Sequence, residues 1–419
     1  MADDTPAGEA TVVVLFYRYE NLGSERAATL AAEQHRLGQE LGLVGRVLVA
    51  PEGINGTVQG SAAAVKAYEA AVEAALTGAV DWKSSSASSE ALFPDLAVKE
   101  VAELVGFGLQ EATPLDVSTE GGIHLPPSEF HSRLLETPPD ELRIIDVRNT
   151  FEYEVGHFDG AVDPGMTHTA QWPRFVNNNL EDLKGRTVML YCTGGIRCEK
   201  ASAYLRRRLK EVDAEAATPV FQLEGGIHRY LEAFPSGGSF KGANFVFDKR
   251  QKMRSADGTV VGRCSECACP WDTHHGGRVC CVCRALVLVC DSCDSASEHG
   301  EYYCAEHVGL RGFYFHFVDR FGGPELEKQA SALQASLDAE TGSKGKTGSG
   351  TGMSKNRRNT LRKKLAQVQE RLKIILEEPT ALDPQRRCRA CERPYVECPG
   401  ACWGFWREES CNMAAAPMS

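Results

Sequence analysis

A cysteine followed by a glycine-rich turn and an arginine is the arrangement in this chain with the clearest chemical potential. In the segment LYCTGGIRCEKASAYL, Cys192 ends a short apolar run and Arg197 opens the helix expected after it. Glycines let successive backbone N–H groups point at one anion, and the first turn of a helix adds its positive dipole end. Both effects lower the pKa of a thiol toward that of a reactive thiolate. We therefore expect Cys192 and Arg197 to be catalytic, on a loop completed by Thr193, Gly194, Gly195 and Ile196.

The length of this loop separates two chemistries. Four residues lie between Cys192 and Arg197, whereas phosphatases with a similar cysteine loop need five, which makes room for a phosphate. The shorter loop suits a persulfide sulfur, and Arg197 offers a fixed charge to an anionic substrate. The alternative is a buried cysteine beside an ordinary turn. Cys198 is either a resolving thiol for Cys192 or a residue packed in the first helical turn, and packing is favoured.

The elements before the loop predict an α+β domain. A β-branched run at 11–17 reads as a buried strand, and the apolar spacing of 24–41 predicts a helix. Two strand-like pieces around a turn and an alanine-rich helix at 61–76 complete a β-α-β-β-α order, typical of a ferredoxin-like sandwich over about 10–112. The turn PEGINGT (51–57) is either a tight turn or a loop that holds phosphate.

The loop itself belongs to a second predicted domain, at 123–239. Strand-like runs at 142–148, 187–192 and 220–226 alternate with helical segments, which predicts a parallel α/β sheet. Chemistry in such sheets gathers at the carboxyl ends of the strands. Cys192 lies at such an end.

Charge and cysteine content favour a reducing compartment. The net charge is −11, and the first ten residues, MADDTPAGEA, do not resemble a signal or transit peptide. No apolar run reaches the roughly 18 residues of a membrane span. We therefore expect a cytoplasmic protein without a membrane partner, whose 16 cysteines are thiols or metal ligands.

Most of the cysteines form pairs with the spacing of metal ligands. Within the region 240–311, four such pairs supply eight ligands, enough for two structural zinc ions: Cys264 and Cys267, Cys280 and Cys283, Cys290 and Cys293, Cys304 and His307. Which pairs share an ion is open, and any of Cys269, Cys281, His274, His275 and His299 could replace a ligand. An iron–sulfur cluster is the rival to zinc. A further four-cysteine site is predicted within 386–411, from Cys388, Cys391, Cys398 and Cys402, which gives one to three zinc ions in all.

Several motifs resemble known families. IIDVRNTFEYEVGHFDGAV resembles the first signature of rhodanese domains, whose residues match Asp146, Arg148, Glu152 and His157. APEGINGTVQG, CTGGIRCEKAS and GANFVFDKR, in this order, resemble the tRNA uridine hydroxylase family over roughly 11–310. The resemblance implies an acylphosphatase-like domain, a rhodanese domain and oxygen-dependent hydroxylation of a wobble uridine to 5-hydroxyuridine, with Cys192 as the active cysteine. For Asp146 and Arg148 an ion pair is the favoured role, and for His157 a turn.

The tail after residue 311 lies beyond this resemblance. Residues 312–354 read as a linker with a possible helix, and 355–378 as a basic amphipathic helix. Either its charges are simply solvated, or they contact tRNA phosphates. The candidates for such contacts are Lys355, Arg357, Arg358, Arg362, Lys363 and Lys364.

Two other functions are compatible with the residues. One is a sulfurtransferase in which Cys192 carries persulfide sulfur from a donor to an acceptor such as tRNA. The other is a non-catalytic zinc scaffold that binds RNA or protein, which the intact loop disfavours. The chain shows no flavin or nicotinamide motif, and its sequence predicts no oligomeric state.

Overall fold

The computed structural model describes most of the chain in two compact units. The first unit is Met1–Arg278 with Ala285–Gly300, and the second is Val279–Arg284 with Glu301–Ser419. The described residues are 11–87, 90–109, 115–212, 218–248, 250, 252–280, 283, 285–297, 302–308, 323–338 and 355–377. None of the helices within these ranges is long and apolar enough to cross a membrane.

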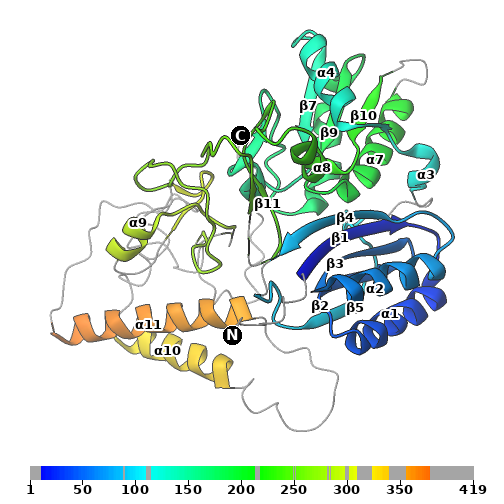
Figure 1. The fold of residues 1–419 in the computed structure, drawn as a ribbon. Helices are drawn as coiled ribbons and strands as arrows, with labels where there is room; N and C mark the ends of the chain where they lie inside the picture. The colour runs from blue at the N-terminus through cyan, green and yellow to red at the C-terminus, as the bar shows by residue number, and fades with distance from the viewer. Residues whose placement is uncertain are drawn as a thin grey trace, which may run out of the picture. The chain divides into compact units, whose positions relative to one another are not determined.

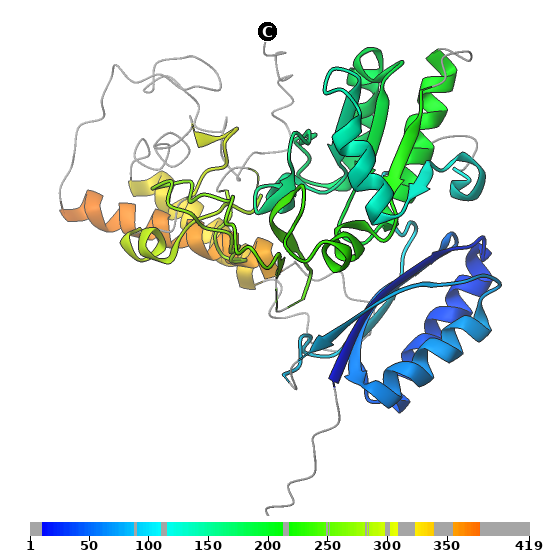
Figure 2. The ribbon, with the colours of Figure 1, turned by 45° about the horizontal axis from the view of Figure 1, so that its top comes forward.

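The first unit begins with a five-stranded sheet that is covered by two helices on one face (Figures 1 and 2). The strand order is β4-β1-β3-β2-β5. Its elements are β1 (Thr11–Tyr19), α1 (Gly23–Glu40), β2 (Val44–Ala50), β3 (Gly53–Ser61), α2 (Ala62–Ala75), β4 (Asp81–Ala87) and β5 (Leu96–Glu100). This α+β arrangement confirms the predicted fold class.

Alternation along β1 decides which side chains reach the helices. Val14 and Phe16 are fully buried in the core under α1 and α2. Because successive side chains of a strand point to opposite faces, Leu15 and Tyr17 point away from the helices. They line a cavity with residues of the following domain. One strand thus contributes to a core with one face and lines a cavity with the other.

The second domain of this unit is a four-stranded parallel sheet of order β6-β10-β9-β7. All three predicted strands, at 142–148, 187–192 and 220–226, are present in this sheet, so the α/β prediction is confirmed. The elements are α3 (Val117–Glu120), β6 (Ile123–Leu125), α4 (Pro127–Glu136), β7 (Leu142–Asp146), α5 (Thr150–Tyr153), β8 (Gly156–Phe158), the 3₁₀ helix Thr169–Gln171, α6 (Trp172–Leu183), β9 (Thr187–Tyr191), α7 (Ile196–Val212), β10 (Val220–Leu223) and α8 (Gly226–Ala233).

A smaller sheet extends this domain. It pairs β8 with β11 (Phe240–Phe245), and β11 with β12 (Lys252–Arg254). The short helix α9 (Asp291–Ala296) follows in the cysteine-rich segment. Because β11 pairs with β8, Gly242 at the start of the GANFVFDKR motif lies opposite Gly156.

The second unit contains two longer helices, α10 (Gly323–Asp338) and α11 (Lys355–Glu377). They pack on each other through a small apolar core that includes Leu326, Leu333, Leu365 and Val368. The predicted basic helix, α11, therefore packs its apolar side chains against α10. The helical spacing of these apolar residues accounts for this packing.

Candidate active site

The cysteine loop joins the end of β9 to the start of α7. Cys192 directly follows β9, and the backbone N–H of Gly195 donates a hydrogen bond of 3.1 Å to its Sγ. Gly195 has φ +102, a conformation that favours glycine. Gly226 lets α8 approach, since a Cβ there would lie 2.6 Å from the carbonyl oxygen of Cys192. The two glycine-dependent turns therefore shape a nest of amides around the sulfur.

Cys192 is fully buried, yet its environment favours the thiolate. Burial by itself raises the pKa. Hydrogen bonds from Cys198, the positive charge of Arg197 and the Gly195 N–H outweigh burial, and they lower the pKa from 9.0 to about 5. Cys198 is itself fully buried in the core of the sheet, and burial raises its own pKa. Cys198 thus packs, as favoured, and also donates a hydrogen bond to Cys192.

Arg197 is engaged differently from the role the sequence suggested. Its guanidinium donates hydrogen bonds of 2.6 and 2.8 Å to the two carboxylate oxygens of Glu152, and one of 3.0 Å to the Thr193 hydroxyl. Glu152 is completely buried. Burial raises the pKa of its carboxyl group, but the charge and hydrogen bonds of Arg197 outweigh burial, so the pKa is lowered. Arg197 therefore supplies positive charge to the loop, while its two terminal nitrogens are bound to the Glu152 carboxylate.

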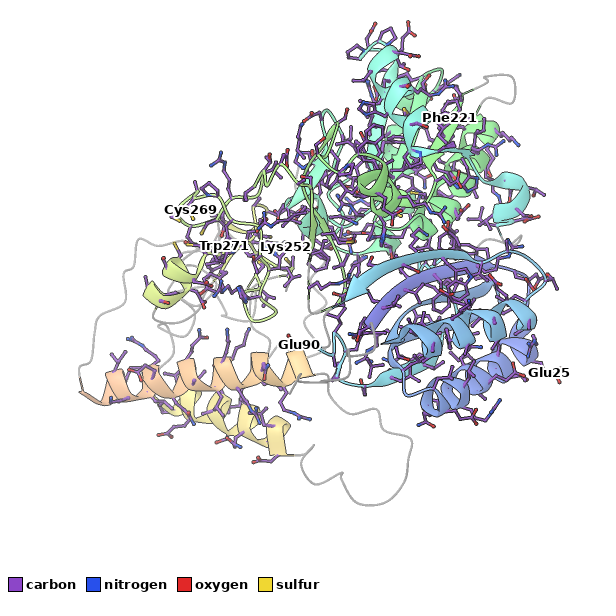
Figure 3. The ribbon with its side chains drawn as sticks, in the orientation of Figure 1. Glu25, Glu90, Phe221, Lys252, Cys269 and Trp271 are labelled. Atoms are coloured by element: carbon purple, nitrogen blue, oxygen red, sulfur yellow. The ribbon has the colours of Figure 1, made fainter. Side chains whose placement is uncertain are left out.

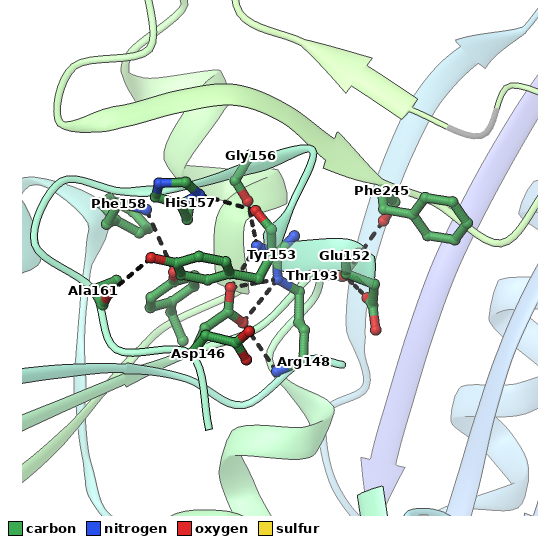
Figure 4. Close-up of polar contacts among 12 residues, drawn as sticks. Asp146, Arg148, Glu152, Tyr153, Gly156, His157, Phe158, Ala161, Thr193 and Phe245 are labelled. Atoms are coloured by element: carbon green, nitrogen blue, oxygen red, sulfur yellow. Dashed lines mark hydrogen bonds and ion pairs between the residues drawn. The ribbon is translucent and has the colours of Figure 1, made fainter. Parts of the chain in front are cut away.

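The other signature residues form a structural cluster (Figure 4). Asp146 and Arg148 are both fully buried and are joined by hydrogen bonds of 2.6 to 3.1 Å. Arg148 also donates to the carbonyl of Gly156 at 2.6 Å. His157 stacks on Tyr153 with ring centroids 4.0 Å apart, and its Nδ1 lies 2.9 Å from the Tyr153 carbonyl oxygen. These contacts fix the strand end and the turn, in the roles that the sequence favoured.

A cavity of about 400 Å³ opens where the loop faces the first domain. The loop contributes Thr193, Gly194, Ile196 and Arg197, whereas Cys192, which precedes them in the chain, is fully buried and is not among the lining residues. The facing sheet contributes side chains from three strands: Leu15, Tyr17, Arg46, Leu48, Asn55 and Thr57. Its volume falls within the range of small-molecule sites in proteins. The arrangement can therefore place a small group beside the thiolate loop.

The contacts that hold the first domain against the loop were not anticipated. Tyr17 donates a hydrogen bond of 2.9 Å to Glu199, which directly follows Cys198 on α7. Lys200 donates to both Glu52 oxygens at 3.1 Å and to Glu103 at 2.5 Å. No local pattern signals these pairs, because their members lie far apart in the chain.

These contacts also show the role of the PEGINGT turn (51–57). Pro51 and Glu52 connect β2 to β3 in a tight hairpin in which Ala50 pairs with Gly53. Glu52 places a carboxylate at the turn, where it binds Lys200 and accepts a hydrogen bond from the Leu104 N–H. A carboxylate repels a phosphate. The turn thus serves as a contact between domains, and the phosphate-binding alternative is not supported.

The low pKa of Cys192 leads to a titration prediction. Subtracting the thiolate absorbance of Cys192→Ser from that of the wild type should leave one transition near pH 5. The pKa is lowered, so the thiolate is populated above that pH and is lost as the pH falls through it. A transition near 8.5, as for a free cysteine, would contradict this environment.

The cysteine-rich segment forms two ligand clusters. Cys264 and Cys267 join Cys290 and Cys293 in the first unit, and Cys280 and Cys283 join Cys304 and His307 in the second. In each cluster the ligand atoms lie within 4.8 Å of one another. The Sγ atoms of Cys267 and Cys290 are 3.7 Å apart, as are those of Cys283 and Cys304. Zinc–sulfur bonds of about 2.3 Å in a tetrahedron require sulfurs about 3.8 Å apart, so both clusters fit such an ion.

The remaining candidate ligands have other positions. His274 lies with Nε2 2.7 Å from the Phe151 carbonyl oxygen, and His275 lies 3.6 Å from Asp291. Cys269 hydrogen-bonds to Cys267 and Cys290 and lies beside the first cluster (Figure 3). Cys281, His299 and the site of Cys388, Cys391, Cys398 and Cys402 fall outside the described residues.

The candidates for RNA contact on α11 differ in exposure. Arg362 and Lys363 are exposed, and Arg358 is half-buried. Lys364 is 6% exposed beside the apolar core of the two helices, so its expected contact with RNA is not supported. The side chains of Lys355 and Arg357 fall outside the described part.

Comparisons with known proteins divide the chain in the same way. Residues 11–104 match the UPF0176 acylphosphatase like domain, 127–233 the Rhodanese-like domain and 241–307 the Rhodanase C-terminal family. These matches lie within the predicted domains, whose outer limits stay predictions. A solved rhodanese-like domain from Anabaena shares 25% identity over 28% of this chain and 78% of that chain, with a TM-score of 0.22.

Relatives match over much longer stretches. Rhodanese-like domain-containing protein 6 of Arabidopsis thaliana is 37% identical over 70% of this chain, although the match spans 52% of that protein. A tRNA uridine(34) hydroxylase of Rhodococcus erythropolis is 36% identical, and the match covers 68% of this chain and 98% of that protein. One from Corynebacterium kroppenstedtii is 37% identical over 96% of its length. By this near-complete match, the chain belongs to the tRNA uridine(34) hydroxylase family.

Proposed function

We propose that this protein is a tRNA-modifying enzyme that hydroxylates the uridine at position 34 to 5-hydroxyuridine. Relatives that match over almost their whole length carry this activity in their names. The observation that carries the proposal is the Cys192 thiolate, held by the Gly195 N–H in a loop whose next residues line a cavity of about 400 Å³. The reaction replaces the hydrogen on C5 of the base with a hydroxyl group. With molecular oxygen as the proposed oxidant, the second oxygen atom would leave as water, which takes two electrons and two protons from a two-electron reductant.

The function is tested by analysing tRNA nucleosides by mass spectrometry. Cells that lack the protein should lose 5-hydroxyuridine at position 34, and a copy of the wild-type gene should restore it. Unchanged 5-hydroxyuridine at position 34 in the deleted cells would overturn the proposal.

Sulfur transfer is the second candidate, favoured by the loop length between Cys192 and Arg197. In that reaction the Cys192 thiolate would take a sulfur atom from a donor and pass it on as a persulfide. The same nucleoside measurement separates the two functions. Loss of a thiouridine with intact 5-hydroxyuridine would support sulfur transfer instead.

We propose that the two ligand clusters hold structural zinc. Three or four thiolates in a closed tetrahedral set are typical of zinc sites that stabilise small folds. The described cysteines carry no disulfide, which suits a reducing compartment such as the cytoplasm. When bound, zinc would cross-link segments that have little apolar core of their own.

The metal content tests this assignment. Elemental analysis of the purified full-length chain should give at least two zinc ions per chain, one for each cluster. Cys267→Ser should lower the content by about one ion, while Cys269→Ser, beside the same cluster, should leave it unchanged. Iron in place of zinc would contradict the assignment.

We also propose that the exposed basic face of α11 contacts tRNA phosphates. Such contacts add affinity that weakens with salt and carry no base specificity. The double variant Arg362→Gln/Lys363→Gln should bind tRNA more weakly and reduce the slope of log affinity against log salt by about 1 to 2. Arg36→Gln, an exposed arginine on α1, is the matched control. An unchanged slope in the double variant would remove α11 from the interface.

A further inference from the structure

Phe247 is an exposed aromatic side chain in an unusual place. It lies in the GANFVFDKR motif, two residues after the end of β11, and is 65% exposed. Among the large apolar side chains exposed in the described part of the chain, the others are aliphatic: Ile123, Leu135, Val212, Val308 and Ile374. A single exposed apolar residue needs no explanation by itself. Its position relative to the loop is what carries the inference.

Phe247 lies at the cavity beside the reactive loop. It lines this cavity together with Thr193 and Arg197. The guanidinium of Arg197 lies 6.0 Å from the centre of its ring, a distance at which a cation attracts an aromatic face. The ring is therefore held next to the residues that surround the Cys192 sulfur.

The ring has rigid support from its own strand. Phe247 packs edge-to-face on Phe245 with centroids 5.2 Å apart, and Phe245 packs in the same way on Phe151 at 5.2 Å. The carbonyl oxygen of Phe245 accepts a hydrogen bond of 3.4 Å from the Thr193 hydroxyl (Figure 4). A flat ring that is fixed on one side and open to solvent on the other is suited to stacking.

The cavity has the chemistry of a site for a pyrimidine base. Leu15 and Leu48 give it apolar surface, and Asn55 adds a side-chain amide. The edge of uracil carries one N–H donor between two carbonyl acceptors, and an amide can both donate and accept. Unpaired RNA bases are commonly read in this way, stacked on an aromatic ring and hydrogen-bonded along the edge.

We infer that Phe247 is the platform on which the target uracil of tRNA stacks, with the base inserted in the cavity beside the Cys192 loop. This inference rests on the proposed function and deepens it, because it assigns the base-binding site. Stacking holds the uracil against Thr193 and Arg197, the loop residues that line the cavity with Phe247. The occupant is an unpaired uridine in a single-stranded loop, since a base inside a helix cannot reach such a pocket.

The test compares two RNA stem–loops that differ at one nucleotide. One carries uridine at position 34, and the other carries an abasic nucleotide there. Stacking of one base on an aromatic side chain corresponds to roughly five- to 150-fold in affinity. The full-length wild type should therefore prefer the uridine stem–loop by about fivefold or more, and Phe247→Ala should abolish the preference. Phe247→Trp should keep it, because tryptophan also offers a flat face.

Leu135→Ala is the matched control, because Leu135 is exposed to the same 65% on α4 and lies outside the cavity. It should leave the preference intact. A Phe247→Ala variant that keeps the full preference would overturn the inference, as would a wild type that binds the two RNAs equally. If the preference depends on Phe247 but wild-type protein forms no 5-hydroxyuridine, the base site stands and the proposed reaction fails.

Discussion

Replacing Cys192 with serine is expected to abolish hydroxylation of uridine 34, with a loss of rate of at least about 10³-fold. The pKa of Cys192 is lowered to about 5, so the wild-type side chain is a thiolate at neutral pH. A serine hydroxyl at the same place stays protonated. Without an adjacent base to take its proton, it is a weak nucleophile. The measurement is the 5-hydroxyuridine content of tRNA treated with purified enzyme.

Cys198→Ser provides the matched control for this variant. Cys198 is buried beside Cys192 and donates a hydrogen bond to it. A serine hydroxyl can donate the same bond, so this variant should keep most of the activity. Both variants should unfold at nearly the same temperature as the wild type. Full turnover by Cys192→Ser would remove the loop from the mechanism.

Arg148→Met is expected to cost about 3 to 5 kcal/mol of the free energy of unfolding. Arg148 and Asp146 are both fully buried, and their side chains are joined by 2.6 Å at the shortest contact. Methionine removes the positive charge and leaves the Asp146 carboxylate buried without its partner. Leaving a charge in this state is far costlier than losing the pair as a whole.

The control for this prediction comes from β7, the strand that ends at Asp146. Arg143 pairs with Asp182 at 2.8 Å, with side chains that are 24% and 47% exposed. Arg143→Met should therefore cost no more than about 1 kcal/mol. Urea unfolding, compared by the midpoints of the three proteins, measures the difference. If Arg148→Met unfolds at the wild-type midpoint, the ion pair does not support the fold.

Local patterns in the sequence were sufficient for the elements and for the loop. The β-branched and aromatic run at 11–17 and the apolar spacing of 24–41 predicted β1 and α1 to within two residues. Glycines at 194 and 195 after a strand predicted a turn that gathers amides around Cys192, as the Gly195 N–H shows. These features depend on neighbours within a few positions, and for that reason one sequence suffices.

The partners of charged and metal-binding residues depended on chain segments that meet only in the folded protein. Cysteine spacing gave the ligand pairs, but packing decided that Cys264 and Cys267 share a cluster with Cys290 and Cys293. Likewise, Arg197 could have faced a substrate, yet folding places the Glu152 carboxylate 2.6 Å from it. By itself the sequence determined many of the elements, the place of the cysteine loop after a strand, and the ligand types. The tertiary structure alone decided which distant groups pair and where the cavity opens, because such contacts depend on how whole layers pack.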